Sequence, residues 1–327
     1  MLNLSTSPHM YSKQTTGGIM LDVIIALIPA LFMGILLFGI QALTVCISAV
    51  TSCVVFEYLL QKYALKQKPQ VNNLSAAVTG LLLAFNLPCN IPLILVLIAS
   101  FVAIGIAKLA YGGLGKNIFN PALVGRVFLF IAFPAYMSSW PKPRFMEFFN
   151  TDAVTSATPL NVMKYTDAAT SATKLSNIMP DYIQMFLGDT GGCLGETSAL
   201  ALLLGFAYLL YKKVIKWHIP VVYICTVFML FAIFYIGTGN AKYDPLAQSL
   251  SGGLMLGAIF MATDYTTSPM TNKGKIIFAL GCGVLTFVIR EYSSYPEGVS
   301  FAILIMNAFV PLIDRFCLPH LFGTRRK

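Results

Sequence analysis

Two hydroxyl-rich heptapeptides, each beginning with a carboxylate, are the residues of this sequence best suited to chemistry. They are Asp152–Thr158 (DAVTSAT) and Asp167–Thr173 (DAATSAT), and both lie in the only long polar segment, at about residues 138–192. A hydroxyl-rich segment of this kind, held at a membrane surface, could be a place where a group is attached or bound. A flexible, soluble hairpin is the alternative, and composition alone favours it.

The composition identifies lipid as the solvent of most of the chain. Hydrophobic residues make up 57% of the 327 residues and charged residues only 11%, whereas soluble proteins carry roughly 25% charge. A single soluble core could not bury so much apolar surface, so we predict a membrane protein. The net charge of +9 does not indicate nucleic-acid binding, because the basic residues lie in short clusters between apolar runs and serve better as topology signals.

Ten apolar runs are candidate membrane spans. Several are shorter than the ~20 residues of a straight crossing. They lie near Gly18–Gly39, Ala42–Gln61, Leu74–Leu87, Ile91–Tyr111, Asn120–Ser139, Gly195–Tyr211, Ile219–Ile236, Pro245–Thr263, Ile276–Arg290 and Val299–Phe316.

The basic residues predict the orientation of these spans. If the N-terminus is cytoplasmic, then of the 22 Lys and Arg residues fifteen lie in inner loops, six lie in outer loops, and Arg126 falls inside a span. This excess on the inner side predicts that both termini are cytoplasmic. Five crossings precede the polar segment, which therefore lies outside.

An internal similarity links the third and eighth spans. Leu74–Phe85 aligns with Leu250–Met261, and each is followed by a polar residue and a proline, which are Asn86 with Pro88 and Asp264 with Pro269. With five spans in each half, the halves enter the membrane in opposite senses, as inverted repeats do. The alternative is that small residues simply allow helices to pack closely.

We therefore predict an all-α membrane protein of about ten transmembrane helices in two inverted five-helix repeats. Residues 1–139 form the first repeat, 140–192 an extracytoplasmic loop, and 193–327 the second repeat.

A few polar side chains lie at or within the predicted spans. An ionised group in mid-bilayer costs roughly 2.5–3.5 kcal/mol on insertion scales, so such groups usually have a role. Asp22 and Glu57, with Asp314, lie toward cytoplasmic span ends and could form a vestibule for a translocated cation. The alternative is that they reach the interface or pair with Lys13, Lys62 and Arg315, respectively.

Polar side chains at two predicted helix starts have structural explanations. For Glu196, at the start of the sixth span, the helix dipole is a sufficient structural reason. Asn117 and Asn120 precede Pro121 at a helix entry, and their amides are also plausible ligands for a buried polar molecule or ion.

The cysteine and histidine patterns argue against a metal centre or haem built by this chain alone. No two of the seven cysteines have C-x-x-C spacing, and none of the three histidines lies in mid-span. Most of the cysteines are expected to be small packing residues. Cys89 and Cys193, both near the predicted outer face, are the one pair whose role stays open.

Several long motifs occur in an order that is typical of a known family. The chain closely resembles the family of RnfD and NqrB, which are membrane subunits of Rnf ferredoxin:NAD⁺ oxidoreductases and of sodium-pumping quinone reductases, over nearly its whole length. The motifs are Ser7–His9, Ile19–Leu27, Asn117–Ala122, Gly191–Ser198, Ala262–Asp264, Thr271–Gly274 and Met306–Asn307.

The resemblance implies a covalent flavin. In that family, flavin mononucleotide (FMN) is joined through its phosphate to the last threonine of a pattern close to Asp-Gly-x-Ser-Gly-Ala-Thr. Carried onto this chain, the pattern begins at Asp152 and ends at Thr158, with Ala153 and Ser156 in place of glycines. Thr173 is the alternative attachment site. A separate flavin transferase that uses FAD as donor would modify the threonine, which should therefore be exposed, flexible and outside.

The resemblance also implies the function. The chain would be an electron-transfer subunit in a bacterial cytoplasmic membrane, coupling electron flow between ferredoxin and NAD⁺ to Na⁺ or H⁺ export, with no activity on its own. A second, noncovalent flavin, riboflavin, is expected within the bundle near Asn120 and Asp264. Neither a G-x-G-x-x-G nor a Walker motif occurs, so nicotinamide binding belongs to a partner subunit. A flavin-free channel or transporter, or a scaffold for redox partners, are the alternatives.

Overall fold

The computed structural model describes residues 15–143, 145, 155–165, 180–196, 198–293 and 295–317. Within these ranges the chain is helical, and the one β contact is an isolated bridge between Pro141 and Thr155. Asp152 and Thr173, which the sequence analysis singles out, lie outside the described residues.

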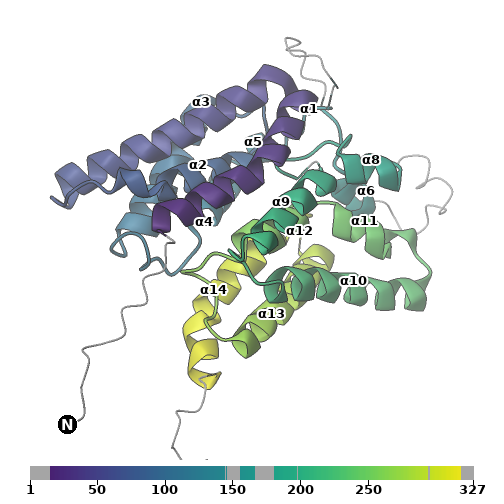
Figure 1. Cartoon of the computed structure of the whole chain (residues 1–327). Coiled ribbons are helices and arrows are strands. Elements are labelled where there is room, and N and C mark those ends of the chain that lie inside the picture. Colours follow the sequence, from purple (N-terminus) through teal and green to yellow (C-terminus); the bar gives the residue numbers. More distant parts are fainter. Residues whose placement is uncertain are drawn as a thin grey trace, which may run out of the picture.

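The helices carry the labels of Figure 1. The first half contains α1 (Thr16–Leu59), η1 (Leu60–Ala64), η2 (Val71–Asn73), α2 (Ser75–Phe85), α3 (Leu93–Phe101), η3 (Val102–Leu109), α4 (Pro121–Ala132) and α5 (Pro134–Met137). The polar segment contributes α6 (Pro159–Tyr165) and α8 (Tyr182–Leu187). The second half contains α9 (Ala199–Tyr211), α10 (His218–Thr238), η4 (Ala241–Tyr243), α11 (Pro245–Leu250), α12 (Leu254–Leu256), η5 (Gly257–Met261), α13 (Asn272–Tyr292) and α14 (Val299–Phe316).

Four of the described helices are long and apolar enough to cross a bilayer. They are α1 continued into η1, α10, α13 and α14, and the last three have 21, 21 and 18 residues. At about 1.5 Å per residue these lengths approach the ~30 Å hydrocarbon core. Shorter apolar helices are α2, α3 continued into η3, α4 and α9. Large side chains such as Phe32, Ile131 and Ile233 are more than 60% exposed, as expected for a surface that faces lipid.

Helix α1 contains the first two predicted spans. Thr15 caps its start, where the Thr15 hydroxyl accepts a hydrogen bond from the amide of Gly18 at 3.1 Å. At Gly39 the backbone has φ 64° and ψ −147°, a conformation that favours glycine because it has no Cβ. The kink divides the helix into two arms. The sequence analysis places a separate crossing in each arm, and this stays a prediction, because the whole segment Thr16–Ala64 forms one candidate span.

The two segments that resemble each other in sequence are both short or broken. Helix α2 has only 11 residues. Its counterpart is interrupted at Ser251–Gly253, between α11 and α12, where Gly252 has φ +59°. A Cβ at Gly252 would lie 2.9 Å from Cδ2 of Leu160, so glycine here allows the break to approach α6.

The two halves lie side by side, and the polar segment is at one end. Figure 1 shows α1–α5 as one group, α9–α14 as another, and α6 and α8 close to α11. Helix α1 packs on α2 and α9, while α13 packs on α10 and α14. The contact between α1 and α9 therefore joins the two halves close to the polar residues described below.

Candidate functional site

Thr158 lies at the start of α6, and it is buried. Its side-chain oxygen accepts a hydrogen bond from the amide of Asn161 at 3.2 Å, which is the geometry of a helix N-cap. Pro159 follows as the first helical residue, where its missing N–H costs nothing. Only 7% of Thr158 is exposed, whereas the sequence analysis expects an exposed hydroxyl. Packing of α6 against the second half accounts for the difference.

Thr158 borders a small cavity, here called the small pocket, which measures about 350 Å³ including space open to solvent. The pocket brings together parts of the sequence that lie far apart, including Gly191, Gly192 and Glu196 of the motif singled out above. Its lining residues are Thr158, Pro159, Leu160, Met185, Thr190, Gly191, Gly192, Glu196, Leu250, Ser251, Gly252 and Glu297.

Two carboxylates of the small pocket share one arginine from the other half of the chain. Arg126, on α4, donates from Nη2 to Oε1 of Glu196 at 3.2 Å and to Oε2 of Glu297. Its Nη1 donates to Oδ1 of Asn86 at 2.8 Å and to Oγ of Ser300 at 2.9 Å. Arg126 is 4% exposed, so its charge is buried together with two opposite charges, the condition under which a buried ion is tolerated.

This network corrects the explanation of Glu196. The sequence analysis assigns its carboxylate to the dipole of a helix start, whereas the structure pairs it with Arg126. Arg126, which the charge count leaves inside a span, is the signal that could have indicated the pair, since a buried cation requires a partner.

Cys193 belongs to the same network, and Cys89 does not. Nη2 of Arg126 lies 3.6 Å from the Cys193 sulfur, which donates to the backbone oxygen of Asn86 at 3.2 Å. Cys89 lies near Gln41 instead, and both cysteines are free. Cys193, Glu196 and Glu297 present ligand-type atoms within 4.8 Å of one another, but the Arg126 guanidinium already supplies their positive partner.

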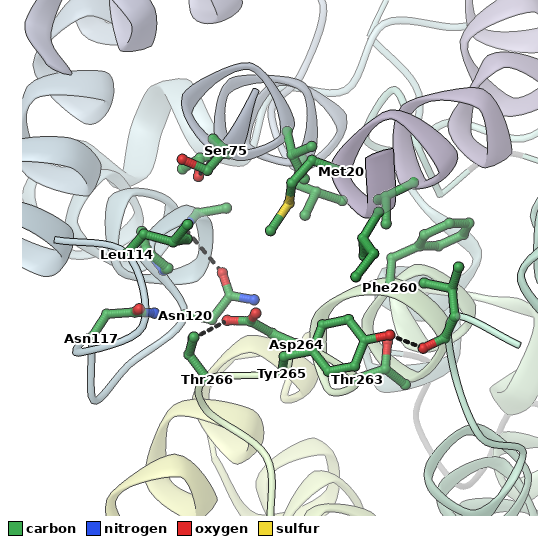
Figure 2. Close-up of a pocket in the computed structure, with 18 of the residues that line it drawn as sticks. Met20, Ser75, Leu114, Asn117, Asn120, Phe260, Thr263, Asp264, Tyr265 and Thr266 are labelled. Atoms are coloured by element: carbon green, nitrogen blue, oxygen red, sulfur yellow. Dashed lines mark hydrogen bonds between the residues drawn. The ribbon is translucent and has the colours of Figure 1, made fainter. Parts of the chain in front are cut away.

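A second cavity, here called the large pocket, lies between the two halves and measures about 770 Å³, including space open to solvent. Figure 2 shows Asn120, Asp264 and Thr266 close together, with Ser75 across the pocket from them and Met20 and Phe260 among the apolar groups. Helices α1, α2, α4 and α9 and the segments around residues 108–120, 214–215 and 260–266 contribute to its wall.

Asn120 and Asp264, the residues that the sequence analysis names for a noncovalent flavin, lie next to each other in this pocket (Figure 2). Asn120 accepts from the amide of Ala122 and donates to the backbone oxygen of Met261, both at 3.1 Å. It thereby fastens the start of α4 to the end of η5. Asp264 accepts from the hydroxyl of Thr266 at 3.0 Å. Asp264 lies in the connection before α13, and its burial raises the pKa of its carboxyl above the ordinary value.

A buried ion pair stands at the edge of the large pocket. Nζ of Lys108, which lines the pocket, lies 2.9 Å from both carboxylate oxygens of Glu57 and 2.7 Å from Oγ of Ser75. Glu57 is 1% exposed. The suggested pairing of Glu57 with Lys62 is wrong, because Nζ of Lys62 lies by the ring and hydroxyl of Tyr58.

Asp22 and Glu57 have different partners in the described residues. Asp22 accepts from the hydroxyl of Tyr208 at 2.9 Å, and its Oδ1 lies 4.0 Å from Nζ of Lys212. Asp314 accepts from the amide of Met270 at 3.1 Å. The three carboxylates therefore do not share a partner, and a common vestibule stays a prediction.

Comparison with known proteins places the chain in one family. The model of the NQR2, RnfD, RnfE family matches residues 3–323. The chain is 47% identical over its whole length, and over 97% of the relative, to the D subunit of the proton-translocating ferredoxin:NAD(+) oxidoreductase complex of Clostridium ljungdahlii. It is 46% identical to the D subunit of the Na(+)-translocating ferredoxin:NAD(+) oxidoreductase complex of Acetobacterium woodii, covering 99% of this chain and 96% of that one. It is also 40% identical to the D subunit of the ion-translocating oxidoreductase complex of Stutzerimonas stutzeri, covering 96% and 94%. The chain therefore belongs to the NQR2, RnfD, RnfE family.

Proposed function

We propose that the chain is a membrane electron-transfer subunit of an ion-translocating ferredoxin:NAD⁺ oxidoreductase. It would carry FMN covalently on Thr158 and couple electron flow to the export of Na⁺ or H⁺. Full-length identity of 46–47% to subunits of two such complexes supports the complex and the role. One of these relatives is named as proton-translocating and the other as Na⁺-translocating, and nearly equal identity to both gives no preference for either ion.

One observation supports Thr158 as the site of FMN attachment. Thr158 and the motif Gly191–Ser198 are separated in sequence, yet Thr158, Gly191, Gly192 and Glu196 line the same small pocket. At Gly191 a Cβ would collide with the Ser156 side chain, so the absence of a side chain lets this wall approach the threonine. Because Thr158 is buried, we expect the flavin transferase to act before α6 packs or while it is displaced.

The chemistry of the residues that line the large pocket supports the proposal that a flavin without phosphate binds there. It offers amide, hydroxyl and carboxylate groups at Asn117, Asn120, Thr263 and Asp264, with apolar residues opposite. Its lining cation, Lys108, is already paired with Glu57. Riboflavin would thus bind by shape and hydrogen bonds, with Asn120 and Asp264 as polar walls. A bound flavin supplies reversible electron transfer, and the protein supplies position and insulation.

We also propose the inverted five-helix repeats, for which the structure offers one support. Ser75 and Ser251 correspond in the internal alignment, and each contacts a buried cation from a later helix. Lys108 donates to Oγ of Ser75 at 2.7 Å, and Arg290 donates to the backbone oxygen of Ser251 at 3.1 Å. In the proposed topology both termini are cytoplasmic, the membrane is the bacterial cytoplasmic membrane, and the segment 140–192 is extracytoplasmic.

Fluorescence of the chain on a denaturing gel tests the proposal. Protein produced in a host with its flavin transferase should give a flavin-fluorescent band, which Thr158→Ala abolishes and Thr173→Ala retains. Thr190→Ala, which removes another hydroxyl from the same pocket wall, is the matched control and should stay fluorescent. Labelling of the 140–192 segment in sealed cells should show that it faces outward.

The alternatives give different results. A band without fluorescence and an intact mass without an adduct would overturn the flavin proposal in favour of a scaffold. Ion conductance by the isolated, flavin-free chain would instead favour a channel or transporter.

A further inference from the structure

A third cavity, here called the lysine pocket, lies at the ends of three apolar helices. Its walls come from the connection between α9 and α10, from the start of α10, and from the segment that leads into α13. The hydroxyl of Tyr265 donates to the backbone oxygen of Val214 and joins two of these walls. The cavity measures about 540 Å³, including space open to solvent. Because α10 and α13 are long enough to cross a bilayer, their ends place the lysine pocket at the boundary between lipid and water.

Three lysines line this pocket, whereas no carboxylate of the described residues does. They are Lys213 and Lys216 in the connection between α9 and α10, and Lys275 in the first turn of α13. Lys216 and Lys275 are close enough for their charges to repel each other. In the part of the chain that the structure describes, none of the three forms an ion pair.

The polar groups around these lysines leave most of the positive charge unbalanced. Nζ of Lys216 donates to Oδ1 of Asn272 at 3.0 Å, and this amide is neutral. Asp314 on α14 is near enough to attract Lys275, but its Oδ1 accepts from the backbone amide of Met270 at 3.1 Å. One carboxylate outside the pocket therefore stands against three ammonium groups that line it.

A buried hydroxyl in the wall of the lysine pocket also has no partner. Ser268 lines the pocket and is only 9% exposed. Its amide donates to the backbone oxygen of Asp264 at 3.1 Å, whereas its hydroxyl makes no hydrogen bond with any described residue. Because buried hydroxyl groups are normally hydrogen-bonded, this one is a donor that a ligand can use. Ammonium and hydroxyl donors around one space suit the oxygens of a phosphate group.

Apolar side chains lie beside the lysines. Ile276 and Ile277 follow Lys275 on α13, and both are exposed. Trp217 follows Lys216 and is exposed at the start of α10, a position that indole rings commonly occupy at a membrane–water interface. A soluble phosphate would contact only the polar donors, whereas a phospholipid would also cover the apolar surface next to them.

We propose that the lysine pocket binds the phosphate of an anionic phospholipid, whose acyl chains lie against the exposed apolar surface of α13. Lys213, Lys216 and Lys275 surround the phosphate, and the hydroxyl of Ser268 donates to one of its oxygens. Basic pockets between helices at the membrane boundary favour anionic head groups, and each basic residue contributes about a fivefold gain in affinity. The lipid site does not depend on either of the flavins proposed above.

Native mass spectrometry of the full chain in detergent tests the inference. The two probes are phosphatidylglycerol, which is anionic, and phosphatidylcholine, which has the same acyl chains and no net charge. The wild type should bind phosphatidylglycerol more tightly. Lys275→Gln should weaken this binding about fivefold, and replacement of all three lysines by glutamine on the order of 100-fold. Lys275→Arg, which keeps the charge, should retain the binding.

Lys273→Gln is the matched control. Lys273 lies on the same first turn of α13 and is exposed, but it does not line the lysine pocket, so its variant should keep the wild-type affinity. Ser268→Ala should weaken phosphatidylglycerol binding by about two- to tenfold, as expected for one hydrogen bond. Without lipid, Lys275→Gln should unfold at the wild-type temperature or above it, because it removes a charge that Lys216 repels. A lysine with a purely structural role would instead lower that temperature.

Four results would overturn the lipid site. Equal affinity for the two lipids, or an equal loss in Lys273→Gln and Lys275→Gln, would mean that only diffuse surface charge attracts lipid. Displacement of phosphatidylglycerol by inorganic phosphate at equal concentration would assign the pocket to free phosphate. Carbodiimide coupling of Lys275 to a partner subunit's carboxylate in the assembled complex, with no lipid retained there, would assign it to an acidic protein surface.

Discussion

The large pocket and the small pocket differ in how their walls are charged. In the large pocket Lys108 is neutralised by Glu57, and the one lining carboxylate, Asp264, is hydrogen-bonded to hydroxyls. In the small pocket two carboxylates, Glu196 and Glu297, line the space next to Thr158. These two carboxylates share one counter-charge, Arg126 on α4, whereas Glu57 and Lys108 form a one-to-one pair.

Two helices connect the pockets. Helix α2 lines the large pocket with Ser75 and Thr79, and Asn86 at its end contacts Arg126. Helix α4 begins at the large pocket with Pro121 and carries Arg126 one and a half turns later. A substitution at one pocket can therefore affect the other through α2 or α4. The predictions below test whether the two pockets behave independently.

The largest expected effect comes from breaking the isolated ion pair. Glu57→Gln leaves the buried Lys108 without an opposite charge, which should lower the free energy of unfolding by about 3–5 kcal/mol. Glu196→Gln leaves Arg126 paired with Glu297 and should cost less, on the order of 1–2 kcal/mol. Denaturant titrations in detergent, followed by circular dichroism, measure both. Adding Lys108→Met to Glu57→Gln should recover most of the loss, because replacing both members of a buried pair is often nearly neutral. Equal costs for the two single variants would contradict the contrast between the pockets.

The next prediction concerns the binding of noncovalent flavin in the large pocket alone. Val23 lines this pocket from α1, so Val23→Trp should fill part of it. Overpacking costs about 1–3 kcal/mol, which corresponds to roughly a five- to 150-fold loss of affinity for noncovalent flavin. Flavin released by denaturation should fall, while the fluorescence of the gel band stays unchanged. Ile25→Trp, at a side chain that is 37% exposed, is the control. A loss of covalent flavin in Val23→Trp would show that the sites are not independent.

A destabilisation of similar size should result from disturbing the packing of α2 against α1. A Cβ at Gly80 would lie 2.7 Å from both the backbone oxygen of Ala49 and the Cα of Val50, so neither α1 nor α2 can yield by moving a side chain. Gly80→Ala should destabilise the protein by about 1–3 kcal/mol. Gly237→Ala, in α10 with no atom within 4 Å of the new Cβ, should be neutral or stabilise by up to about 1 kcal/mol. Thermal unfolding of the two variants makes the comparison, and equal stability would mean that α1 and α2 can separate freely.

The sequence predicts the helical membrane character and the family well, because both depend on local features. Apolar runs appear directly in composition, and the motifs that carry the resemblance are contiguous. Asn120 and Asp264, which the sequence analysis names together, line one pocket, but their role in binding a flavin stays a prediction. The sequence cannot choose ion-pair partners, because Glu57 and Lys108 are 51 residues apart and Lys62 is an equally good electrostatic candidate. The burial of Thr158 was missed for the same reason, since residues of the second half cover it.

The smallest expected effect tests whether charge or geometry holds the Arg126 network. Ser300→Ala removes one acceptor of Nη1 of Arg126 at 2.9 Å but leaves Asn86 at 2.8 Å and both carboxylates in place. The expected loss is about 1 kcal/mol of unfolding free energy, as for a single hydrogen bond. Ser249→Ala is the matched control, because Ser249 is also buried and its hydroxyl donates only to the backbone oxygen of Pro245, one helical turn earlier. If Ser300→Ala costs as much as Glu196→Gln, then the exact placement of the guanidinium matters more than its second carboxylate. The charge contrast between the two pockets would then arise from how α4 and α14 pack, rather than from a requirement to balance charge.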